Sequence, residues 1–203
     1  MKYKKLGKLP SETIEFFKKE ILKRKTLSSY QWIQFDKYLN DKFAEIFCNT
    51  ELKIQYDPSR DRLIQKAFYS APNHGFKIHK DGLNCKSALN IAISCNDTDW
   101  VRWYDDDVIN RLTNNIKCTS NSSYGISRDC QIDNYEDIPY TQELHNEVGD
   151  VYTLNVDTFH SFKCVGTEPR IIIQTKFSDY PTFSMISESL NKNSFKNIIS
   201  CQT

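Results

Sequence analysis

The chain has 203 residues, 27 of them basic and 26 acidic, with a formal net charge of +1. This length suits one domain with a sizeable core, so we expect residues 1–203 to form a single domain. The balanced charge gives no reason to expect nucleic acid as a partner, because nucleic-acid binding favours a strongly basic face.

Two absences bear on where the protein works. The longest apolar runs fall well short of the ~18 residues of a membrane span, and no apolar stretch follows the basic N-terminus as in a secretory signal. The seven cysteines are odd in number, irregularly spaced and without a Cys-x-x-Cys pair. This pattern favours reduced thiols over a zinc ribbon or a disulfide scaffold. We therefore expect an intracellular, cytoplasmic protein with no membrane partner.

The first 50 residues are predicted to be a helical support for the rest of the chain. Ser11 can cap a helix that runs to about Lys25 with apolar residues at helical spacing. A second helix is predicted from Tyr30 to Phe47, because an aromatic and aliphatic stripe follows the same spacing. We expect this stripe to be core, and its members are Trp32, Phe35, Leu39, Phe43 and Phe47.

From Ile54 onward the pattern changes to short β-like runs separated by turn residues. The stretch from Leu63 to Tyr69 fits a strand or a short helix equally well, and the tail from Ser184 to Ile199 is predicted to be a short helix. Such runs predict a mainly β fold, an antiparallel sandwich or barrel flanked by helices. The runs are Phe76–His79, Ala88–Ser94, Val101–Tyr104, Val151–Val156, Phe159–Val165 and Ile171–Phe177.

Residues 105–146 interrupt this pattern with a segment rich in Asn, Ser, Asp and Thr. A long irregular insertion in a compact domain is either a lid or binding loop, or poorly ordered. The acidic run at its start, Asp105 to Asp107, is predicted to be a solvated turn rather than a second cation site.

The most informative residues are two histidines, an aspartate and an arginine. His79 and Asp81 stand two apart in a β-like run, so alternation points both side chains the same way. His160 stands in a later run, and Arg170 opens the last one. Two histidines and one carboxylate on one side of a metal form the site of non-haem Fe(II) oxygenases. A guanidinium fork nearby suits a dicarboxylate co-substrate.

Other interpretations of these residues remain open. His79 and Asp81 could belong to a surface turn, His160 to the core, and Arg170 to a surface ion pair. His145 could replace His160 as the third ligand. His74 is a poor substitute, because five residues separate it from His79 and alternation places the two on opposite faces.

The order His-x-Asp, a long gap, His and then Arg resembles the Fe(II)/2-oxoglutarate-dependent dioxygenase superfamily. The resemblance covers roughly the last two thirds of the chain and implies a double-stranded β-helix (jelly-roll or cupin-like) core. It implies that His79, Asp81 and His160 bind Fe(II), and that Arg170 holds the distal carboxylate of 2-oxoglutarate. Members of this superfamily often carry Ser or Thr two residues past the arginine, whereas this chain has Ile172.

The resemblance also implies a reaction with O2 that hydroxylates a C–H bond and releases succinate and CO2. The substrate would be a protein side chain or a small metabolite. Asn90, Trp103 and Tyr104 are candidates for lining the pocket, and the partner of the Asn90 amide is either the co-substrate carboxylate or a backbone group. The second contact to the distal carboxylate comes from elsewhere than residue 172. Two alternatives stay open: a cupin-like binding module without catalysis, and an enzyme of the same fold that uses another metal or chemistry.

Overall fold

The computed structural model describes residues 1–47, 56–57, 62–63, 65–81, 85–113, 117–122, 125–129, 132, 134–176 and 182–189. Four α-helices and one 3-10 helix accompany the strands in these residues. The helices are α1 (Ser11–Arg24), α2 (Lys37–Phe47), α3 (Asp106–Leu112), η1 (Tyr135–Asp137) and α4 (Phe183–Ser189).

The strands of the described residues, in chain order, are β1 (Tyr3–Lys8), β2 (Tyr30–Gln34), β3 (Tyr56–Asp57), β4 (Arg62–Leu63), β5 (Lys66–Ser70), β6 (Gly75–Lys80), β7 (Ser87–Ser94), β8 (Trp100–Trp103), β9 (Lys117–Ser122), β10 (Gly125–Asp129), β11 (Gln142–Leu144), β12 (Asp150–Asn155), β13 (His160–Lys163) and β14 (Arg170–Lys176).

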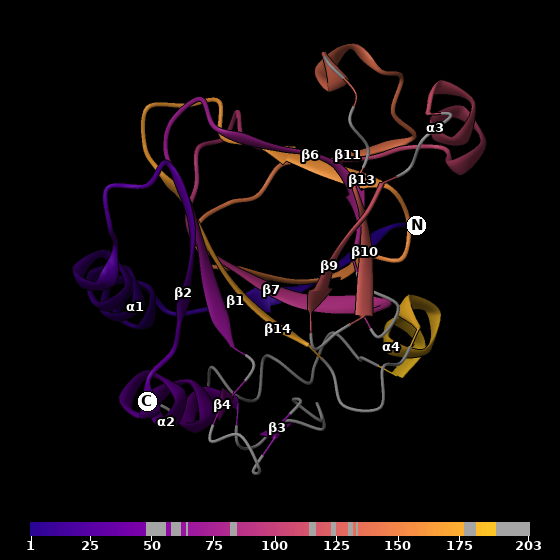
Figure 1. Cartoon of the computed structure of the whole chain (residues 1–203). Helices are drawn as coiled ribbons and strands as arrows, with labels where there is room; N and C mark the ends of the chain where they lie inside the picture. Colours follow the sequence, from indigo (N-terminus) through magenta and orange to yellow (C-terminus); the bar gives the residue numbers. More distant parts are fainter. Residues whose placement is uncertain are drawn as a thin grey trace.

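Most of these strands form two six-stranded sheets. The first sheet has the order β1-β12-β7-β14-β5-β2, and the second has the order β11-β8-β13-β6-β10-β9. All pairings are antiparallel, and Figure 1 shows the two sheets as facing layers, with α1 and α2 outside the first sheet. This is the mainly β architecture with flanking helices that the sequence predicted.

Apolar side chains fill three layers that hold the sheets in place. The outer face of the first sheet packs on α1 and α2 in one cluster, which includes Ile91 of β7 and Phe17 of α1. The space between the sheets holds a second cluster, which includes Trp103, Tyr152 and Ile172. The third cluster lies on the outer face of the second sheet, beneath α3. Each sheet therefore packs on its outer face as well as on the other sheet, and this packing holds the inward-facing residues in position.

The segment predicted as one helix from Tyr30 to Phe47 is a strand followed by a helix. Tyr30–Gln34 is β2, the edge strand beside β5. Asp36 stands just before α2, and its Oδ1 accepts a hydrogen bond from the backbone N–H of Leu39 at 2.9 Å. Trp32 is 54% exposed, whereas its neighbour Ile33 is buried. The helix prediction was wrong for residues 30–34, because this segment is a strand in which burial follows alternate residues and not helical spacing.

The segment 105–146 is more regular in its described parts than the sequence indicated. It contains α3, β9, β10, η1 and β11, and Asp105 caps α3 by accepting the backbone N–H groups of Asp107 and Val108. Near the end of the chain, α4 covers Phe183–Ser189, while the rest of the predicted tail helix lies outside the described residues. In the described part of the chain, no helix has both the length and the apolar character needed to cross a membrane.

Candidate metal centre

Two neighbouring strand ends, the end of β6 and the start of β13, place His79, Asp81 and His160 together. His79 stands near the end of β6, and His160 opens β13 directly opposite it in the antiparallel register. Asp81 follows β6, where its backbone N–H donates to the carbonyl of Val156 at 3.1 Å. This bond fixes the chain just beyond the strand, so the carboxylate turns back toward the two imidazoles.

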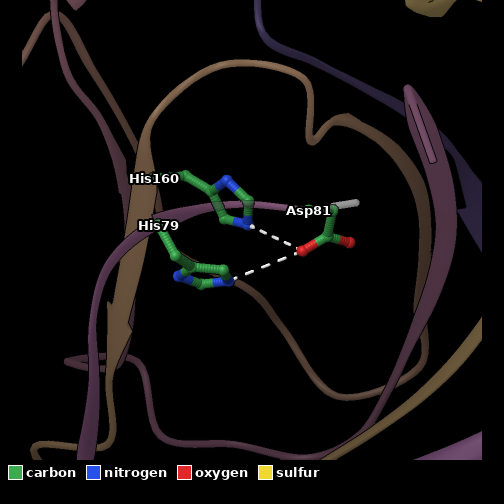
Figure 2. A group of neighbouring side chains, drawn as sticks. All are labelled: His79, Asp81 and His160. Carbon is green, nitrogen blue, oxygen red and sulfur yellow. Dashed lines mark ion pairs between the residues drawn. The ribbon is translucent and has the colours of Figure 1, made fainter. Parts of the chain in front are cut away.

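The three side chains converge on one point, as Figure 2 shows. His79 Nε2 lies 3.6 Å from Asp81 Oδ1, and His160 Nε2 lies 3.9 Å from the same oxygen. One ligand atom from each residue lies within 4.8 Å of the other two, and this is the group of the described residues that could hold a metal ion. Ligands of a single cation at metal–ligand bonds of ~2.1 Å have separations of this order.

Backbone carbonyls set which imidazole nitrogen is available in each histidine. His79 Nδ1 lies 2.8 Å from the carbonyl of Lys77, and His160 Nδ1 lies 2.9 Å from the carbonyl of Thr158. A carbonyl only accepts, so each Nδ1 carries a hydrogen, and the neutral form of each ring then has its lone pair on Nε2. Both Nε2 atoms face Asp81 and are thus in the form that binds a metal.

Burial favours the neutral form of the His160 imidazole. The residue is 7% exposed. Burial, and then the neighbouring imidazole of His79, lower the pKa of His160 to about 4, against the opposing charge of Asp81. The imidazole is therefore neutral near neutral pH, as metal binding requires.

A buried thiol holds the other oxygen of the carboxylate. Cys85 is 2% exposed, and its Sγ donates to Asp81 Oδ2 at 3.6 Å. The contact leaves Oδ1 directed at the two histidines. Nothing in the sequence pattern indicated this role, because Cys85 lies outside the predicted strands.

Arg170 is buried between the sheets rather than placed on the surface. It opens β14, is 4% exposed, and its guanidinium carbon lies 4.7 Å from the ring centre of Phe162 on the facing sheet. It forms no ion pair with any described residue, and its Nε has no hydrogen-bond partner among them. A buried cation without an acidic partner is costly unless a ligand supplies the charge.

The remaining predicted residues differ in position. Asn90 lies on the inward face of β7, buried, with its Oδ1 without a partner in the described chain. Trp103 lies opposite His160 in the register but is fully buried, and its Nε1 donates to the carbonyl of Asn155 at 2.8 Å. It therefore packs beside His160, in the layer between the two sheets.

Tyr104 lies away from the metal centre. Its ring belongs to the apolar cluster on the outer face of the second sheet, and its hydroxyl is 2.7 Å from Ser161 Oγ. The expected pocket-lining role of Tyr104 does not fit this position. Successive residues of a strand point to opposite faces, so Trp103 and Tyr104 do not share one face.

The two other histidines lie outside the group. His145 Nε2 lies 2.8 Å from Glu143 Oε1, and its Nδ1 lies 3.0 Å from the carbonyl of Asp99. His74 stacks on Tyr30 at 5.4 Å between ring centres. The structure thus brings His160, and not His145, to the pair formed by His79 and Asp81.

No protein-family model matches the sequence, and no curated protein has a similar sequence. Solved structures do match. HygX from Streptomyces hygroscopicus with nickel and 2-oxoglutarate bound has a TM-score of 0.54 and 9% identity, over 87% of this chain and 83% of HygX. The epimerase SnoN in complex with Fe3+, α-ketoglutarate and nogalamycin RO has a TM-score of 0.52 and 11% identity, over 85% of this chain and 77% of SnoN.

These similarities define the fold. The chain has the jelly-roll fold of 2-oxoglutarate-dependent oxygenase structures, as the order of its motifs implied. At this level of identity the comparison shows the fold alone. The chemistry must therefore be argued from the residues of this chain.

Proposed function

We propose that the protein is an Fe(II)- and 2-oxoglutarate-dependent dioxygenase that hydroxylates a C–H bond of a protein side chain or a small metabolite. The observation that carries the proposal is the pair of Nε2 atoms, each freed by an Nδ1–H bonded to a backbone carbonyl, that face one oxygen of Asp81. Two imidazoles and one carboxylate match the ligand set of non-haem Fe(II) oxygenases.

In this proposal His79, Asp81 and His160 hold Fe(II) on one side and leave its opposite side open. Arg170, which lacks an acidic partner in the described residues, binds the distal carboxylate of 2-oxoglutarate. When bound, iron and 2-oxoglutarate supply the oxidation, in which one oxygen atom of O2 enters the C–H bond and the other leaves in succinate together with CO2. The chain's own part is to orient these groups and exclude water.

The direct test is anaerobic addition of Fe(II) and 2-oxoglutarate to the protein, followed by visible absorption. A charge-transfer band is expected, because 2-oxoglutarate then chelates the iron. The variants His79→Ala and Asp81→Ala should lose the band. His145→Ala is the matched control and should keep it, since His145 is bound to Glu143 and Asp99 outside the group.

A second measurement follows succinate in air across a panel of peptides and small metabolites. Succinate above the substrate-free level identifies the substrate class. A wild-type protein that gives no band, and no iron-dependent binding of 2-oxoglutarate, would refute the proposal. Retained binding of another ligand in that case would favour a cupin-like binding module.

A further inference from the structure

Buried polar atoms without partners gather on one face of the first sheet. Among the described residues they include Arg170 Nε, Ser70 Oγ and Asn90 Oδ1, which come from β14, β5 and β7. Each of the three residues is at most 5% exposed. Native structures leave few buried polar groups unpaired, so three on adjacent strands indicate a place that a polar ligand completes.

The register shows that this face is the inward one. Ile172 shares a face with Arg170 by alternation and packs in the cluster between the sheets. Tyr152 belongs to the same cluster and stands directly opposite Asn90. The guanidinium of Arg170 lies over Phe162, which belongs to the second sheet.

Ser70 is the polar residue nearest to Arg170 in the register. Arg170 stands opposite Ser70 in the β14–β5 pair, and Ser70 stands opposite Tyr30 in the β5–β2 pair. Directly opposite residues of an antiparallel pair point to the same face with Cβ atoms ~5 Å apart. Ser70 is fully buried and its hydroxyl has no partner among the described residues, whereas the Tyr30 hydroxyl accepts from Trp32 Nε1 at 2.8 Å and keeps its own hydrogen to donate.

The position two residues past the arginine offers no hydroxyl. Ile172 occupies it, is 1% exposed and packs among apolar side chains. A carboxylate has about four lone-pair sites, of which a guanidinium fork uses two. A second donor is therefore needed on the same inward face, within reach of the fork.

We propose that the Ser70 hydroxyl is this donor and binds, together with Arg170, the distal carboxylate of 2-oxoglutarate. The proposal rests on the proposed function and deepens it. It assigns to β5 the contact that the side chain of residue 172 cannot make. Ser70 is a binding residue for the co-substrate and has no contact with the metal ligands in this assignment.

The test compares Ser70→Ala with Ser70→Thr, which keeps a hydroxyl, and with Thr153→Val. Thr153 is the matched control, because its buried hydroxyl points to the other face of the same sheet and donates to the carbonyl of Ala88 at 3.2 Å. For each protein, the dissociation constant of 2-oxoglutarate is measured by anaerobic titration in the presence of Fe(II). The affinity for Fe(II) alone and the thermal midpoint without ligand are measured beside it.

Ser70→Ala should weaken 2-oxoglutarate binding by roughly 10- to 100-fold, the worth of one hydrogen bond to a charged group. Its affinity for Fe(II) and its midpoint should not fall, because the hydroxyl has no partner in the ligand-free protein. Thr153→Val should lower the midpoint and leave 2-oxoglutarate binding within about twofold. Ser70→Thr should bind more tightly than Ser70→Ala.

Two results would overturn the assignment. Wild-type affinity for 2-oxoglutarate in Ser70→Ala would remove Ser70 from the subsite and leave the proposed function intact. A fall in the midpoint with unchanged affinity would give Ser70 a structural role only. Failure of the wild-type protein itself to bind 2-oxoglutarate with Fe(II) would instead overturn the proposed function, and the assignment with it.

Discussion

Replacing Arg170 by Met should change ligand binding and stability in opposite directions. The guanidinium is 4% exposed and forms no ion pair with a described residue. Met fills a similar volume without a charge, so the ligand-free protein should become more stable. Exchange of buried ionic groups for apolar ones stabilises proteins by about 1–4 kcal/mol.

The contact with Phe162 reduces this gain. The guanidinium carbon lies 4.7 Å from the ring centre, and such an interaction is worth about 0.5–2 kcal/mol. We therefore expect a net stabilisation of about 1–2 kcal/mol, which in a chain of this size raises the thermal midpoint by about 2–8 °C. The assay is thermal unfolding of the metal-free protein, with Arg170→Lys as the variant that keeps a charge.

Binding of 2-oxoglutarate should weaken strongly in the same variant. Two charge-assisted hydrogen bonds of about 1.5–3 kcal/mol each are lost, which corresponds to at least about 100-fold in the dissociation constant. Addition of 2-oxoglutarate and Fe(II) should then raise the midpoint of the wild-type protein but not that of Arg170→Met. A variant that is destabilised and still binds 2-oxoglutarate normally would show that Arg170 is structural, and the reasoning would fail.

Three further substitutions test separate contacts. Cys85→Ala should weaken Fe(II) binding by about 10-fold in an anaerobic titration, because Asp81 loses the thiol that orients it; Cys85→Ser should bind more tightly than Cys85→Ala, and equal affinities would exclude this role. Gly149→Ala should lower stability to denaturant by at least about 1 kcal/mol, since φ is +89° and the new Cβ would lie 2.8 Å from Ile14 Cδ1. Asp105→Ala should cost about 1 kcal/mol through the lost α3 cap, with Fe(II) binding unchanged.

The sequence predicted the β-rich fold because its strands are short, apolar and separated by turn residues. Alternation also indicated that His79 and Asp81 share a face. In the structure Asp81 lies just beyond the strand, and its direction depends on the hydrogen bond from its backbone N–H to the carbonyl of Val156. Alternation correctly placed His79 and Asp81 near each other, but the position of Asp81 also depends on Val156, which lies 75 residues further along the chain.

The partnership of His79 with His160 could not be derived from spacing. It depends on the antiparallel register between β6 and β13, which contains a shift between His160 and Phe162. A shift of this kind changes the face of every residue on one side of it. The sequence favoured His160 over His145 because His160 stands in a β-like run and fits the order of motifs in oxygenases, whereas His145 precedes a likely turn.

The sequence also did not identify Ser70 as a candidate site residue, because the pairing of its strand could not be predicted. The stretch from Leu63 to Tyr69 fitted a strand and a helix equally, so no face could be assigned to the residue that follows it. Pairing with β14 and β2 determines the strand, since β5 lies between them and its residues are mostly buried. Burial on both faces removes the alternation of apolar and polar residues that would have marked the strand.

The arrangement of the inward-facing side chains depends on the register between neighbouring strands of the first sheet. Arg170, Ser70 and Tyr30 share a face only while β14, β5 and β2 keep their pairing. A slip of one residue between β14 and β5 would leave Ile171, which packs against the helices, opposite Ser70. The apolar contacts of α1 and α2 on the outer face oppose such a slip, because it would turn the aliphatic residues of β14 that face these helices toward the inward face. The packing of α1 and α2 on the outer face therefore helps to keep Arg170, Ser70 and Tyr30 on one inward face.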